Sequence, residues 1–323
     1  MLSITDFTNE IRKQVIDFLP EEYQQSECRM ETVTKNNGIQ KTGITIWQPA
    51  NSITPILYLD DFYREYRQGV SMNAILSKIS DIYVQSIRSE IFVSKADFVA
   101  YDRVKDNITL KLVNRKANRQ LLRELPHKDI EDLSITYQIF LPEFHDEGSA
   151  SAKVTNQLMD SWEIDMETLH QTAVENSLRL EPPVFKSMTA AMGEIIMEDE
   201  SVGDLFKDRE IFLQAAPDMM YILTNRDKLY GASALVYPQV LEQISEVFLE
   251  GFYILPSSVH EVLIMPKPGV APPQELGTMV REVNQKEVSK EEVLSDRVYE
   301  YDKDAKEFHQ VAGSLKKERG MER

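Results

Sequence analysis

Cysteine is almost missing from the sequence, with Cys28 alone among 323 residues. A single cysteine excludes an intramolecular disulfide framework and any cysteine-rich metal site. Such a chain suits a reducing compartment. No apolar run of signal-peptide type opens the chain, and no stretch reaches the roughly 18 consecutive apolar residues of a membrane span. These absences predict a cytoplasmic protein that does not engage a membrane.

Basic residues are also few, because 36 Lys and Arg stand against 53 Asp and Glu, which gives a formal net charge of −17. Such acidity repels phosphate backbones, so we expect no direct binding of nucleic acid. The carboxylates are scattered along the chain rather than gathered in blocks, which is typical of a solvated surface. An acidic mimic of nucleic acid, occupying a basic groove of another protein, stays open as an alternative.

Loops and clusters that hold cofactors or metals are missing as well. Neither a Walker-type glycine-lysine loop nor a dinucleotide-binding fingerprint occurs. Glu167 and His170 have the three-residue spacing of di-iron helical bundles, but those sites need a second such pair and the sequence has none. We therefore expect neither a cofactor nor a metal, and we interpret Glu167 and His170 as a pair at the surface or at the edge of the core.

What the sequence does contain is the composition of a globular protein, 42% apolar and 28% charged. Runs of helical period alternate with short strand-like runs, which predicts an α+β fold of mixed, mainly antiparallel sheets with covering helices. The polar stretch that ends near residue 148 predicts two lobes, residues 1–148 and residues 149–312. Residues 313–323 have almost no apolar content and are predicted to be a disordered tail.

Several elements are predicted by local pattern. In the first lobe an apolar stripe marks a helix over residues 71–89, and Asn36-Asn37-Gly38 predicts the turn of a hairpin. A second hairpin is expected to close the fold, with strands over 298–301 and 307–311. Residues 219–266 are the most apolar stretch. They predict a strand-strand-helix-strand-strand unit with strands over 221–223, 232–237, 252–255 and 259–265 and a helix over 240–248.

Five segments of the chain carry a family resemblance: LTN at 223–225, GASAL at 231–235, YP at 237–238, YILPSSVHEV at 253–262 and EVLSD at 292–296. They resemble a family of unknown function that is abundant in gut Clostridia. A second uncharacterised family of Firmicutes, with a segment of the YILPSS type, is similar more distantly. The resemblance implies a bacterial cytosolic protein, and it implies no catalytic residue.

The most suggestive polar cluster is Ser257, Ser258, His260 and Glu261, between two predicted strands. Hydroxyl, imidazole and carboxylate are the parts of an activated nucleophile. Alternation along a strand places His260 and Glu261 on opposite faces, so a catalytic triad would need an acid from elsewhere in the chain. The competing interpretation is a turn with His260 hydrogen-bonded at the sheet edge.

The leading functional hypothesis is a non-enzymatic module that binds or regulates another protein, because no cofactor loop, metal set or catalytic spacing is complete. The first alternative is a hydrolase that uses Ser258 and His260. The second is the acidic mimic of nucleic acid.

Overall fold

The computed structural model describes residues 1–48, 56–88, 100–141, 150–197, 204–207, 220–267 and 269–311. The chain forms two compact units, and the second is discontinuous in sequence. Unit 1 comprises Met1–Lys105 with Leu141–Ala150, and unit 2 comprises Asp106–Phe140 with Ser151–Arg323. Over the described residues the helices accompany three antiparallel sheets, so the predicted α+β class is confirmed.

Unit 1 packs helices on a three-stranded sheet of order β1-β2-β3. The predicted hairpin is confirmed, because β1 and β2 pair from Glu27↔Trp47 to Thr34↔Gln40 around a turn in which Asn37 has a φ of 57°. Its core joins apolar side chains of α1, β2 and α3. The elements are α1 (Ile4–Gln14), β1 (Glu27–Thr34), β2 (Gln40–Trp47), β3 (Leu57–Tyr58), α2 (Asp60–Arg67), α3 (Met72–Arg88) and α5 (Tyr101–Val104).

Unit 2 contains a four-stranded sheet in which β6 pairs with β4, β5 and β7. Helix α7 is fixed to β4 by two bonds: the Leu110 N–H donates to Ser177 Oγ over 2.9 Å, and Asn176 Nδ2 donates to the Ile108 carbonyl over 3.0 Å. The elements are β4 (Ile108–Asn114), β5 (Lys128–Ile130), β6 (Leu133–Leu141), β7 (Ala150–Lys153), α6 (Asn156–Ser161) and α7 (Met166–Leu180).

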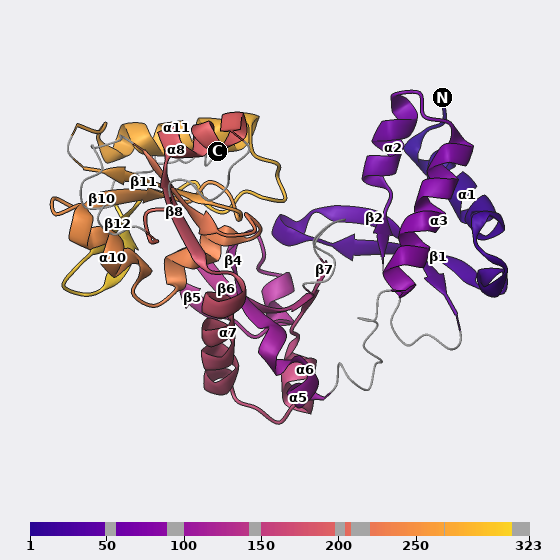
Figure 1. The fold of residues 1–323 in the computed structure, drawn as a ribbon, viewed down its shortest axis with the longest axis horizontal. Helices are drawn as coiled ribbons and strands as arrows, with labels where there is room; N and C mark the ends of the chain where they lie inside the picture. The colour runs from indigo at the N-terminus through magenta and orange to yellow at the C-terminus, as the bar shows by residue number, and fades with distance from the viewer. Residues whose placement is uncertain are drawn as a thin grey trace, which may run out of the picture. The chain divides into compact units, whose positions relative to one another are not determined.

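The second sheet of unit 2 has six strands in the order β13-β12-β10-β11-β9-β8, and every neighbouring pair is antiparallel. Helix α11 covers one face, and α10 lies on the opposite side of the sheet (Figure 1). The elements are β8 (Pro183–Ser187), α8 (Met188–Met197), β9 (Tyr221–Asn225), α10 (Val240–Val247), β10 (Phe252–Leu255), β11 (Val262–Pro266), α11 (Pro273–Lys286), β12 (Tyr299–Asp302) and β13 (Glu307–Gln310).

One predicted strand is wrong. Residues 232–237 form no strand, because Gly231–Val236 is a 3-10 helix, η7. Its residues Gly231 to Leu235 are all buried, and small side chains at these positions let the backbone approach β9 and β4 closely. The unit is therefore strand, 3-10 helix, helix, strand, strand, and the predicted closing hairpin is confirmed as β12 and β13.

The predicted lobe boundary does not coincide with the two compact units. Residues 106–140 belong to unit 2, because β4 and β6 pair with each other and α7 packs on β4. Position 148 itself and the predicted tail at 313–323 lie outside the described residues. Among the described helices, none combines the length and the apolar content that crossing a membrane requires.

Candidate functional site

The segment that contains the four candidate residues connects β10 to β11 in unit 2. It is fastened by backbone bonds to residues 292–294: the Val259 N–H donates to the Glu292 carbonyl over 2.8 Å, and the Leu294 N–H donates to the Ser257 carbonyl over 2.9 Å. Ser258 forms an isolated bridge with Val293. The connection between β10 and β11 is therefore short and held in place by backbone hydrogen bonds.

The polar groups of this connection do not form the pair that a nucleophile requires. Ser258 Oγ accepts the backbone N–H of His260 over 3.0 Å, which is the bond of a tight turn. The His260 imidazole faces elsewhere, since Nδ1 accepts the Tyr230 N–H over 3.3 Å and Nε2 lies 3.7 Å from Glu292 Oε1. These contacts of Ser258 and His260 do not support the hydrolase hypothesis, which stays a prediction.

His260 instead joins the turn after β9 to the start of β11. Its ring stacks on Tyr230 with centroids 5.5 Å apart and planes at 16°, and Lys111 Nζ lies 3.5 Å from the centroid of the Tyr230 ring. The His260 carbonyl accepts the Thr224 hydroxyl over 2.8 Å. Ring and backbone of His260 are therefore both engaged just before β11, an interior strand of the six-stranded sheet.

Gly231 lies where this joint is tightest. A Cβ at this position would come within 2.2 Å of Thr224 Oγ1, 2.5 Å of the Asn225 nitrogen and 2.6 Å of the His260 carbonyl oxygen. Two of these atoms belong to the backbone, so they cannot move away cheaply. Only glycine fits this close approach of three chain segments.

We expect Gly231→Ala to lower the free energy of unfolding by about 1–3 kcal/mol, because the methyl group overpacks a rigid contact. Urea titration measures the loss. Gly193→Ala in α8 is the matched control, since among the described residues no atom outside the local helix backbone lies within 4 Å of the added Cβ. The control should be neutral or gain up to about 1 kcal/mol from helix propensity. Equal stability of both variants would contradict the close packing.

Glu261, the fourth candidate, is exposed and lies on a pocket of about 520 Å³. The pocket is formed around β8, the start of α8 and the end of β9. Its apolar wall is made of Val184, Met188, Ala191, Met192 and Ile222. Its charged residues are Lys186, Asp204, Lys207, Arg226, Lys228 and Glu261, and Thr224 and Asn225 complete it.

The floor of the pocket is fixed by Asp204. Its Oδ1 accepts the N–H groups of Phe185 and Phe206 over 3.3 and 3.2 Å, and its Oδ2 lies 3.4 Å from Lys207 Nζ. The Leu205 N–H donates to the Phe185 carbonyl over 2.7 Å. The outward N–H and C=O of Phe185 on edge strand β8 are therefore both occupied.

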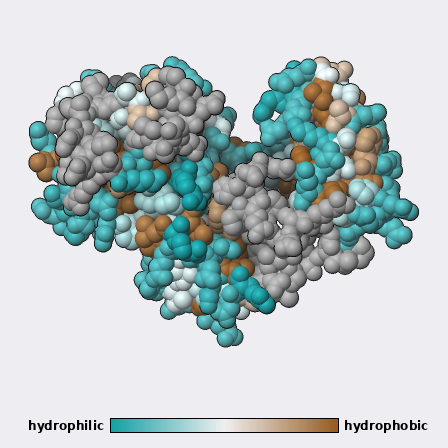
Figure 2. All heavy atoms as spheres, viewed as in Figure 1, coloured by the Kyte–Doolittle hydropathy of each residue, from teal (hydrophilic) through white to brown (hydrophobic). Residues whose placement is uncertain are grey.

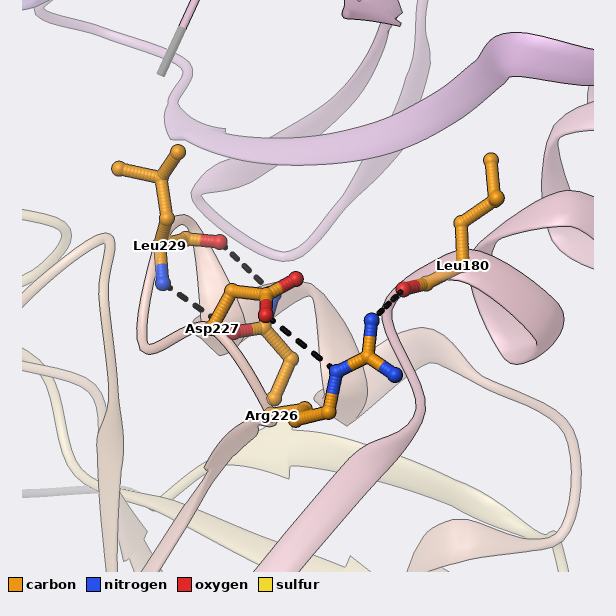
Figure 3. Close-up of polar contacts among 5 residues, drawn as sticks. Leu180, Arg226, Asp227 and Leu229 are labelled. Carbon is orange, nitrogen blue, oxygen red and sulfur yellow. Dashed lines mark hydrogen bonds and ion pairs between the residues drawn. The ribbon is translucent and has the colours of Figure 1, made fainter. Parts of the chain in front are cut away.

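At the mouth of the pocket, Arg226 links the end of β9 to the end of α7. Its Nη2 donates to the Leu180 carbonyl over 3.2 Å, and its Nε lies 3.3 Å from Asp227 Oδ1 (Figure 3). Next to this arginine, Asn225 closes the turn through two bonds with Leu229, of 2.7 and 3.1 Å. The arginine side chain nevertheless stays 61% exposed.

Behind this turn lies a buried carboxylate that the sequence did not point to. Glu181, at the C-terminus of α7, is 2% exposed, and its Oε2 has no hydrogen-bond partner among the described residues. The pKa of Glu181 is raised to about 7, chiefly by burial; the hydrogen bond from the Thr109 hydroxyl opposes this rise, and the nearby charge of Asp227 adds to it. A glutamate in front of two prolines resembles any polar helix end, so only its tertiary surroundings distinguish it.

The remaining sequence candidates lie apart from the pocket. His170 Nδ1 is 3.0 Å from the Tyr137 hydroxyl, and Glu167 Oε2 is 3.0 Å from Lys128 Nζ, so each of the two side chains has a partner on another element. Cys28 is a buried thiol of β1 whose pKa is raised by burial to about 11. Within the described part of the chain, no three His, Cys, Asp or Glu residues form a metal-binding group.

Comparison with known proteins gives one result. The profile of a family of unknown function, DUF5688, matches residues 4–303. The chain belongs to this family. The match covers both units and nearly the whole chain, so the resemblance predicted from the sequence to a family of unknown function is confirmed at that level. No curated protein and no solved structure matches the chain.

Proposed function

We propose that this chain is a bacterial cytosolic protein that acts as a non-enzymatic binding module for another protein. The observation that carries the proposal is the pocket of about 520 Å³ beside β8, with Met188 and Met192 in its wall. Met192 is 60% exposed, whereas soluble proteins usually bury such side chains. Methionine is flexible and polarizable, and it is frequent on surfaces that adapt to a partner.

The distribution of apolar side chains elsewhere supports a local site. On the face displayed in Figure 2, hydrophobic residues lie in small groups between hydrophilic ones. Small, scattered groups of this kind are normal on a monomer and need no explanation. A pocket of several hundred cubic ångströms with a mostly apolar wall and a few placed polar groups is the usual form of a binding site.

The test compares tagged wild-type protein with Met192→Glu and Met279→Glu in affinity capture from the native cell, followed by quantitative mass spectrometry. Met279 is the matched control, because it is also exposed, at 37%, but lies on α11 outside the pocket. Burying an unpaired polar group in an apolar contact costs about 1–3 kcal/mol and a carboxylate costs more, so we expect at least a roughly fivefold loss of the partner with Met192→Glu.

The control variant should recover the partner as the wild type does. If all three baits recover the same proteins in equal amounts, the pocket does not contribute to binding of the partner. Recovery of background proteins alone, under gentle conditions at low dilution, would remove the support for a binding module.

A further inference from the structure

We infer that the pocket beside β8 receives a peptide segment of the partner in which a carboxylate side chain stands next to an apolar one. This inference rests on the proposed function and specifies its ligand. The first argument is a reversal of charge. The chain as a whole carries 36 basic and 53 acidic residues, whereas the pocket is lined by four basic and two acidic ones.

The acidic residues of the pocket reduce this positive potential only in part. Asp204 is 5% exposed and already accepts two backbone N–H groups beside Lys207, so its charge is compensated within the protein. Glu261 stands exposed at the rim. A carboxylate of the ligand would therefore be attracted toward the basic side chains and repelled by Glu261, which gives the ligand a preferred orientation.

Two basic groups at the mouth are accessible to a ligand. The side chains of Lys207 and Arg226 are 72% and 61% exposed. The contacts of Arg226 with Leu180 and Asp227 use two N–H groups, and a guanidinium has five in a planar fork that matches a carboxylate. Lys186, which is 7% exposed and has contacts within the protein, adds its charge from below.

The apolar part of the ligand follows from the wall. Val184 and Ile222 project from the paired strands β8 and β9, and Met188 and Met192 come from the first turns of α8. A carboxylate alone would leave this wall exposed to water. A neighbouring leucine, isoleucine, methionine or phenylalanine would cover it and remove this apolar surface from water.

The edge of the sheet shows how such a segment would be recognised. Strand β8 is the last strand of its sheet, and an open edge invites pairing with a strand of another protein. At Phe185, however, the outward N–H is bound to Asp204 and the outward carbonyl to Leu205. Recognition would therefore come from side chains in the pocket rather than from an added strand.

The test is binding of the full-length protein to an array of immobilised 12-residue peptides whose charge and hydropathy vary systematically. We expect enrichment of peptides that place Asp or Glu beside a large apolar residue, and weaker binding at higher salt. Arg226→Glu should reduce binding to these peptides by at least about tenfold, because it removes a charge-assisted contact and adds a repulsive charge.

Glu261→Gln should act in the opposite direction and strengthen binding of the same peptides, because it removes a like charge from the rim. Glu250→Gln, an exposed glutamate outside the pocket, is the control and should have no effect. Circular dichroism of each variant establishes that it is folded.

Enrichment of basic or uncharged peptides, or no peptide binding at all, would overturn the inference. Binding of decanoate is monitored by NMR of the methionine methyl groups. If decanoate binds and no peptide does, the inference is also overturned, because the pocket would then hold a small amphipathic anion. The proposed function fails separately: if Met192→Glu still abolishes capture of the partner while the array shows no acidic preference, only the ligand chemistry is wrong.

Discussion

Replacing Glu181 with glutamine is expected to flatten the dependence of unit 2 stability on pH between about 4.5 and 7. Glu181 is 2% exposed, and burial raises its pKa from an ordinary value near 4.5 to about 7. A pKa raised by folding means that the native state holds the proton more tightly than the unfolded state does. The stabilisation is complete below pH 4.5 and is lost as the pH rises through 7.

The size of this effect follows from the same pKa values. A difference of one pKa unit corresponds to about 1.4 kcal/mol, so the wild type should lose about 3 kcal/mol across the window. The glutamine variant does not titrate and should lose nothing there, which makes it the more stable protein above neutral pH. Urea unfolding at half-unit steps from pH 4 to pH 8, followed by the fluorescence of Trp162 in unit 2, measures both curves.

Asp227→Asn gives an independent check with a defined sign. The Asp227 charge is one of the causes that raise the pKa of Glu181, so its removal should shift the loss of stability to lower pH. Arg226 has a second contact, with the Leu180 carbonyl, and should keep the turn in place. Parallel pH curves for the wild type and Glu181→Gln would show that the carboxylate does not titrate in this window.

Local chemistry explains which parts of the fold could be predicted from the sequence. The turn at Asn36-Asn37-Gly38 was predictable because Asn37 and Gly38 both adopt positive φ, which asparagine and glycine tolerate best. Helix α3 was predictable because its apolar stripe repeats at the helical period. In both cases residues close in sequence determine the structure.

The wrong strand at 232–237, and the division of the chain into units, arise where residues distant in sequence decide the structure. An apolar run such as 232–236 fits a buried strand as well as a buried 3-10 helix, and the choice depends on how closely β4 and β9 approach Gly231. The assignment of residues 106–140 to unit 2 depends on α7, which follows them by some tens of residues. Neither contact leaves a periodic pattern in the chain.

Among the residues that line the pocket, only Glu261 was a candidate from the sequence. Of the four sequence candidates at the junction of β10 and β11, Glu261 lies on the pocket, whereas Ser258 and His260 form hydrogen bonds within this junction and to the turn after β9. The basic residues come from three separate segments, around β8, residues 204–207 and the end of β9. Convergence of this kind depends on strand order, which short sequence patterns do not encode.

The largest expected change in stability comes from truncating Phe7 in unit 1. Its side chain is fully buried, and its ring centroid lies 5.2 Å from both Tyr63 and Tyr66. Phe7→Ala should therefore lower the stability of unit 1 by about 3–5 kcal/mol, through lost burial and the cavity left behind. If the two units fold independently, unit 2 should be unaffected.

The two tryptophans separate the units, because Trp47 lies on β2 of unit 1 and Trp162 lies in unit 2. Trp162→Phe and Trp47→Phe backgrounds report on units 1 and 2 respectively during urea unfolding. Phe185→Ala is the matched control, since Phe185 is fully buried in unit 2 and stacks on Tyr221 at 5.3 Å. It should lower only the Trp162 transition. If either variant shifted both unfolding transitions, the two units would unfold as one cooperative unit. In independent domains, truncating a core side chain of one domain leaves the unfolding transition of the other unchanged.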